Sequence, residues 1–176
     1  MKKANFLKKD YKMIKYTDAQ ITFREVPDEI SLSINISNCP YKCQGCHSPR
    51  LQQNIGKELT KEIIYDLIEQ HKSEITCVTF LGDGGNMKEI ADLIKYVHLN
   101  GYLTCLYTGS TNIDDIIHEC DGCLNFLKIG QYVKKFGGLD SSSTNQRFIK
   151  IHYKDDANGK KFVEYKDLTE RFRIKY

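Results

Sequence analysis

The sequence lacks a long apolar run and a strong excess of charge of either sign. Its longest hydrophobic runs fall far short of the roughly 20 residues that a membrane-spanning helix needs. The net charge is only +3 over 176 residues, whereas nucleic-acid binding normally requires a concentrated basic face. We therefore expect a protein that binds neither a membrane nor nucleic acid.

The amino-terminal residues also lack the apolar segment of a secretory signal. Two lysines resemble the basic start of a signal peptide, but Asn5, Lys8 and Asp10 interrupt the apolar region that should follow. The chain has seven cysteines, and an odd number does not suit a secreted disulfide framework. These features predict a reduced protein of the cytoplasm.

Familiar catalytic arrangements of side chains are missing as well. No serine–histidine–aspartate arrangement and no paired-carboxylate pattern stands out in the sequence, which suits a reaction carried by a bound cofactor.

The chain shows no internal repeat and no low-complexity stretch, and its length indicates a single domain.

Strands and helices are expected to alternate along the chain. Residues 30–37 alternate apolar and polar side chains, as a half-buried strand does. Residues 75–81 are almost continuously apolar, as in a parallel sheet covered on both faces. Further strands are expected at 103–107, 124–129 and 147–153, and helices at about 60–71, 87–99 and 113–118.

This alternation, with its short links, indicates right-handed βαβ units and a parallel sheet. The units are too few to close an eight-fold barrel. We therefore predict an α/β fold, an incomplete (β/α) barrel with a curved, mostly parallel sheet. Such folds place their chemistry in the loops after the strands, so those loops should meet at one edge.

Three closely spaced cysteines form the most informative motif. Cys39, Cys43 and Cys46 follow the strand at 30–37 with the spacing C-x3-C-x2-C and no fourth cysteine nearby. Three thiolates suit an iron–sulfur cube with one iron left open, and an open position marks metal sites that do chemistry. The alternative is a structural zinc site completed by His47 or a distant cysteine, although no matching second pair of ligands is evident.

A glycine-rich turn follows the next strand, at Gly82-Asp83-Gly84-Gly85-Asn86. Such turns are common, but some allow close approach of a ligand to the backbone. One βα unit after the cysteine loop, the carbonyl groups of these glycines are candidates to hold the ammonium group of a ligand.

The remaining cysteines are given simpler interpretations. Cys120 and Cys123 could form a redox pair or hold a second metal, but a lone pair supplies only half of a metal site. We favour a structural role for both. Cys77 and Cys105 lie inside apolar strands and are expected in the core.

Together these motifs resemble the radical S-adenosylmethionine (SAM) enzymes. More closely, the chain resembles the family of activating proteins of the anaerobic (class III) ribonucleoside-triphosphate reductase. The resemblance spans about residues 20–150. It is carried by the cysteine loop, Gly84-Gly85, 107–109, 127–132 and 137–147.

The resemblance implies a 4Fe–4S cluster on the three cysteines and SAM bound to the open iron. The cysteines would be the catalytic residues, with no separate acid or base. It also implies that Gly84 and Gly85 hold the SAM ammonium and that Gly45 and His47, on either side of Cys46, lie against the adenine.

Two positions depart from the pattern of the family. Gly45 stands where many radical SAM enzymes have an aromatic residue, so stacking on the adenine must come from elsewhere. Asn86 stands where many relatives have an acidic residue after the paired glycines, which makes Asp83 a candidate source of that charge.

The implied function is that of an activase. With an electron from an external, flavodoxin-like donor, it would cleave SAM and place a glycyl radical on the anaerobic reductase. We expect a polar extension at 1–15, a radical SAM domain at 16–153 and an appendage at 154–176. The alternatives are an activase of another glycyl radical enzyme, a small-molecule enzyme, or a non-catalytic zinc-binding interaction module.

Overall fold

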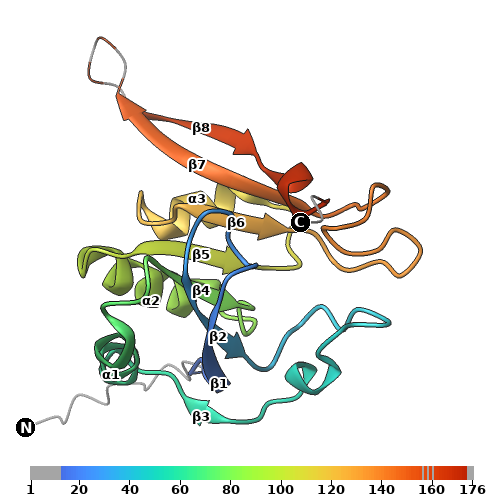
Figure 1. The fold of residues 1–176 in the computed structure, drawn as a ribbon, viewed down its shortest axis with the longest axis horizontal. Coiled ribbons are helices and arrows are strands. Elements are labelled where there is room, and N and C mark those ends of the chain that lie inside the picture. Colours follow the sequence, from blue (N-terminus) through green and yellow to red (C-terminus); the bar gives the residue numbers. More distant parts are fainter. Residues whose placement is uncertain (1–12, 156, 158, 160, 174–176) are drawn as a thin grey trace, which may run out of the picture.

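The computed structural model describes residues 13–155, 157, 159 and 161–173 of the chain, which form one mixed sheet flanked by helices (Figure 1). The sheet has eight strands in the order β3-β1-β2-β4-β5-β6-β7-β8. Their bounds are β1 Lys15–Thr22, β2 Ser31–Ile36, β3 Lys57–Glu58, β4 Cys77–Leu81, β5 Leu103–Tyr107, β6 Phe126–Ile129, β7 Arg147–Asp155 and β8 Lys161–Asp167.

The middle of the sheet is parallel and its two sides are antiparallel. β2, β4, β5 and β6 run in one direction, while β1, β3, β7 and β8 join by antiparallel pairing. The strands expected from the sequence are confirmed, with ends shifted by a few residues. The curved, open barrel stays a prediction.

Three helices follow the expected segments: α1 Lys61–His71, α2 Met87–Leu99 and α3 Ile113–Cys120. Each begins at a polar side chain that accepts a backbone N–H of the first turn, as N-capping residues do. The caps are Thr60, Asn86 and Asn112. Gly101 follows α2 with a positive φ of 87°, as expected for a residue that ends a helix.

Alternation along the strands divides the core into two clusters. Leu32, Phe80 and Leu127 point to the face that the helices cover and join the larger cluster. Cys105 and Phe148 belong to a smaller cluster on the opposite face, which we call the second face. That face is covered by Val26, from the connection between β1 and β2, and by Leu168 and Phe172 near the carboxyl end.

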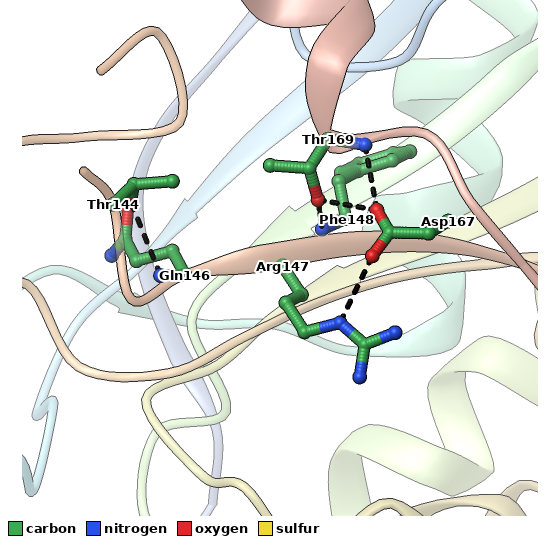
Figure 2. Close-up of polar contacts among 6 residues, drawn as sticks. All are labelled: Thr144, Gln146, Arg147, Phe148, Asp167 and Thr169. Atoms are coloured by element: carbon green, nitrogen blue, oxygen red, sulfur yellow. Dashed lines mark hydrogen bonds and ion pairs between the residues drawn. The ribbon is translucent and has the colours of Figure 1, made fainter. Parts of the chain in front are cut away.

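The carboxyl-terminal residues are built into the sheet. β8 pairs with β7 along its whole length, and the 3-10 helix η2 (Thr169–Arg173) follows it. Figure 2 shows how the end of β8 is fixed to the start of β7: Phe148 N donates to Thr169 Oγ1 at 2.9 Å, and Arg147 Nε donates to Asp167 Oδ2 at 3.0 Å.

Two other expectations concern the amino-terminal residues and membrane-spanning helices. Most of the polar extension expected at residues 1–15 lies outside the described residues, and β1 already begins at Lys15. Among the described residues, no helix combines the length and the apolar character needed to cross a membrane.

Candidate metal centre

The loops with the sequence motifs follow neighbouring parallel strands. The cysteine loop follows β2, the glycine turn follows β4, and Thr108-Gly109 follows β5. A longer loop, residues 130–146, follows β6 and projects on the same side as the cysteine loop (Figure 1). Because the carboxyl ends of parallel strands lie at one edge, the topology brings these loops together.

The cysteine loop is a tight curl with fixed ends. Asn38 N donates to Gln53 O at 2.9 Å and Cys39 N donates to Leu51 O at 3.0 Å. These two hydrogen bonds hold the beginning and the end of the loop side by side. Within it, Lys42 and Gly45 have positive φ angles of 48° and 77°. Gly45 is the residue type that adopts this conformation at least cost, which explains the absence of an aromatic side chain there.

All three loop cysteines are free thiols and only partly buried. The N–H of Ser48 points at Cys46 Sγ, 3.4 Å away. Burial raises the pKa of Cys39, although the backbone N–H groups of Tyr41 and Lys42 act to lower it. Amide donors of this kind stabilise a thiolate, which is the form that binds iron.

A buried carboxylate connects the cysteine loop to the next two strands. Asp83 Oδ2 accepts hydrogen bonds from the Tyr41 hydroxyl at 2.8 Å and from the Thr108 hydroxyl, and Asp83 Oδ1 accepts from Gly85 N at 3.0 Å. Asp83 is 3% exposed. Burial is the main reason that the pKa of Tyr41 rises to about 12, so this phenol stays protonated. Asp83 thus connects the cysteine loop, the glycine turn and the loop after β5.

A close contact confirms that the loops meet. A Cβ atom at Gly109 would overlap the Tyr41 ring, so only glycine fits below it. A cavity of about 330 Å³ opens beside Tyr41, Asp83 and Gly85, towards the start of α3. Its size is at the lower end of the range for small-molecule sites.

The paired glycines adopt conformations that favour glycine. Gly84 and Gly85 have φ angles of 60° and 71°, and a Cβ on Gly84 would lie 2.7 Å from Ile14 Cδ1. The carbonyl of Gly84 already accepts a hydrogen bond from Asn38 Nδ2 at 2.9 Å. It keeps a second lone pair.

Asn86, the second departure from the family pattern, has a structural task in this chain. Its Oδ1 accepts from Glu89 N at 3.3 Å, and its Nδ2 donates to Glu89 Oε2 at 3.0 Å. Asn86 therefore caps α2 and brings an acidic side chain to the first turn of that helix.

Two residues near the cysteines were given no role by sequence reasoning. Tyr132 lies against the loop: its Cε1 is 3.6 Å from where a Cβ of Gly45 would be, and its ring centroid is 5.3 Å from that of His47. Position 45 carries no aromatic side chain, and the loop after β6 places the Tyr132 ring beside it.

The other is Lys128, near the end of β6. Its Nζ donates to Gly130 O at 2.8 Å. Burial lowers its pKa to about 8, while Cys43, Cys39 and Cys46 all act to raise it. A charged residue between the apolar Leu127 and Ile129 was the available signal in the sequence.

The other cysteines lie elsewhere. Cys77 and Cys105 are fully buried in β4 and β5, as expected. Cys120 ends α3 and is also buried, whereas Cys123 is partly exposed. Burial raises the pKa of Cys120 to about 12 and also raises that of Cys123.

The donor set of the cysteine loop fits an iron–sulfur cluster. Across the described residues, no group of three or more His, Cys, Asp or Glu side chains could hold a single metal ion. A cube makes a different demand, because each thiolate binds a different iron. Three free, partly buried thiols on one curled loop, with an amide donor and the partly buried ammonium of Lys128 nearby, meet that demand.

Comparison with protein families gives a match in agreement with this donor set. Residues 30–149, more than half of the chain, match the family model described as "4Fe-4S single cluster domain". Searches of curated proteins and of solved structures found no match.

Proposed function

We propose that this chain, which belongs to the 4Fe–4S single cluster domain family, is a radical SAM activase that generates a glycyl radical on anaerobic ribonucleoside-triphosphate reductase. The observation that carries the proposal is the C-x3-C-x2-C loop itself. It offers three thiols to a four-iron cluster, which leaves one iron for another ligand.

Cys39, Cys43 and Cys46 would hold the cluster at the edge of the parallel strands. When bound, the cluster would supply the single electron for reductive cleavage of SAM to methionine and 5′-deoxyadenosine, the hydrogen atom coming from a glycine of the partner. The remaining task of the protein is to position these groups and to limit their contact with water.

Several contacts support a ligand site beside the cluster. The Gly85 turn borders the cavity, and positive φ angles orient its peptide groups. The carboxylate of Asp83 already has three donors. We therefore assign Asp83 to fixing this turn, with the ammonium of SAM held by glycine carbonyl groups.

Tyr132 supports the adenine part of the proposal. The resemblance placed the base against Gly45 and His47, and Tyr132 is the aromatic ring in contact with both. Stacking on an aromatic ring depends little on which base is stacked, because every base has a π-face. Tyr132 would supply the stacking surface that Gly45 lacks.

The partner and the compartment belong to the same proposal. A protein substrate needs an accessible edge, and the cysteines and His47 lie on a loop that is at least partly exposed. An external one-electron donor of the flavodoxin type would reduce the cluster. The cytoplasm keeps thiols reduced and suits a site of this kind.

The direct test is anaerobic reconstitution with iron and sulfide, followed by reductant and SAM. We expect 5′-deoxyadenosine to form, and a glycyl-radical EPR signal to appear when the reductase is added. Absence of 5′-deoxyadenosine from protein with a full cluster would rule out SAM cleavage. A signal only with a different glycyl radical enzyme would keep the chemistry and change the partner.

The non-catalytic zinc module is distinguished by colour. Protein purified without oxygen should be brown with broad visible absorption, because iron–sulfur clusters absorb visible light and zinc sites do not. Colourless protein with one zinc per chain would favour the zinc module.

A further inference from the structure

Lys128 is a largely but not fully buried cation on the second face of the sheet. Its neighbours Leu127 and Ile129 point into the helix-covered core, so the alternation of β6 directs Lys128 to the opposite face. Across the sheet it pairs with Tyr107 on β5 and with Phe148 on β7. Phe148 is fully buried and Tyr107 is partly buried, so both side chains restrict the access of water to the aliphatic part of Lys128.

The ammonium group has little to compensate its charge within the protein. One hydrogen bond is recorded for Nζ, to the carbonyl of Gly130 at 2.8 Å. Among the described residues, no carboxylate forms an ion pair with it. A buried charge without a counter-ion is costly, and such groups are normally paired.

The cysteine loop lies next to this charge: Gly130, which accepts the bond from Nζ, begins the loop that places the Tyr132 ring against Gly45 of the cysteine loop. As thiolates, Cys43, Cys39 and Cys46 all act to raise the pKa of Lys128. These are the same three thiols that form the donor set, and they come from a different strand end. One side chain therefore lies within electrostatic range of every protein ligand of the cluster.

We infer that Lys128 is the counter-charge of the iron–sulfur cluster and raises its reduction potential. A cluster bound by three thiolates is anionic and gains one more negative charge when a one-electron reductant reduces it. A fixed positive charge stabilises the reduced form more than the oxidised form. Burial makes this effect stronger, because little water screens the pair.

This inference depends on the cluster and not on SAM chemistry. It therefore goes beyond the proposed function, and it can be tested without SAM or a partner. Lys128 would change the reduction potential of the cluster through its charge and would not itself react.

The chain provides a matched control. Lys134 also lies beside the cysteine loop, with its Cδ 3.7 Å from where a Cβ of Gly45 would be, but it is exposed to solvent. Water and salt should screen its charge. Lys128→Met and Lys134→Met each remove one positive charge near the same loop, from a buried and from an exposed position.

The experiment is a redox titration of reconstituted protein without SAM. The EPR signal of the reduced cluster serves as the readout at each potential. We expect Lys128→Met to lower the equilibrium constant for reduction at least tenfold, a shift of about 59 mV to more negative potential. Lys134→Met should change it less than about threefold. A wild-type potential in Lys128→Met with full iron content would overturn the inference.

Loss of the whole cluster in Lys128→Met would be decided by two further variants. Lys128→Arg keeps the charge, and Lys128→Gln keeps polarity without charge. Cluster retention in the arginine variant but not in the glutamine variant would support the counter-charge. Equal loss in both, or equal retention with the same potential, would show that the side chain acts through packing and would overturn it.

Discussion

The cysteines at the strand ends and the cysteines inside the strands have opposite environments. Cys39, Cys43 and Cys46 are partly exposed on a curled loop. Cys77 and Cys105 lie in the middle of the sheet with no exposed surface, and burial raises the pKa of both. The same side chain is therefore accessible to a metal at the edge of the sheet and packs as an apolar residue within it.

The difference comes from position relative to the sheet edge. A thiol within a strand is surrounded by neighbouring strands, and this burial disfavours the thiolate and raises the pKa. A thiol in a loop after a strand is reached by backbone N–H groups and by solvent. The five predictions below test this contrast.

The largest effect is expected from removing one loop cysteine. Cys43→Ala should lose the cluster and all SAM cleavage, because two thiolates cannot hold a four-iron cube in an open site. The measurements are iron content and 5′-deoxyadenosine formation. Cys105→Ala, the matched change inside a strand, should keep the iron and lose about 1–2 kcal/mol of unfolding free energy. Normal SAM cleavage by Cys43→Ala would contradict the assignment.

The buried thiols should destabilise the cluster-free protein at high pH. Burial raises the pKa of Cys77 from its ordinary value of 9.0 to about 12, so the folded chain holds this proton more tightly than the unfolded chain. Its contribution is complete below pH 9.0 and is lost as the pH rises towards about 12. We expect a loss of about 2 kcal/mol from Cys77 by about pH 10.5.

Urea unfolding at neutral and at alkaline pH measures this loss. In Cys77→Ala the difference between the two conditions should be smaller than in the wild type. An unchanged difference would mean that Cys77 ionises as easily in the folded chain as in the unfolded chain.

Removing the hydroxyl of Tyr41 should loosen the loop and leave its ring in place. Tyr41→Phe takes one donor from the buried Asp83 carboxylate, which typically costs about 1–2 kcal/mol. Iron should leave the reconstituted variant faster when a chelator is added. Tyr65→Phe, on the exposed side of α1, is the control and should behave as the wild type. Equal iron release from both variants would remove Asp83 from its proposed role.

Tyr132 provides a test specific to the adenine. Tyr132→Leu should weaken SAM binding to the reconstituted protein about tenfold, since stacking of a base on an aromatic ring contributes about 1–3 kcal/mol. Tyr132→Phe should bind nearly as the wild type does. Methionine, which has no base, should bind equally to all three proteins in equilibrium titrations. Wild-type affinity of Tyr132→Leu for SAM would refute the stacking contact.

The smallest effect is expected at the second pair of cysteines. Cys123→Ala should keep wild-type iron content and SAM cleavage, because this residue follows α3 and its thiol donates to Asp121 O, outside the cysteine loop. Iron per chain is the measurement, and the value for Cys120→Ala should agree with it. Loss of iron in either variant would indicate a second metal site.

The sequence predicted the regular centre of the fold well. The strands that became β4 and β5 stand out because their residues are nearly all apolar, and Thr60 marks the start of α1 as an N-cap. β1 and β8 were missed, because both are rich in polar and charged residues. Their places in the sheet depend on pairing with β2 and β7, which lies outside any local pattern.

By itself, the sequence determined the donor set: three cysteines at a spacing that places them on one short loop, directly after a strand. The tertiary structure decided what surrounds them. Tyr132 and Lys128 approach from β6 and the loop that follows it, and Asp83 reaches Tyr41 from β4. The physical reason is that spacing fixes distances only along a short stretch of chain. Contacts between residues about 40 to 90 positions apart depend on which strands become neighbours.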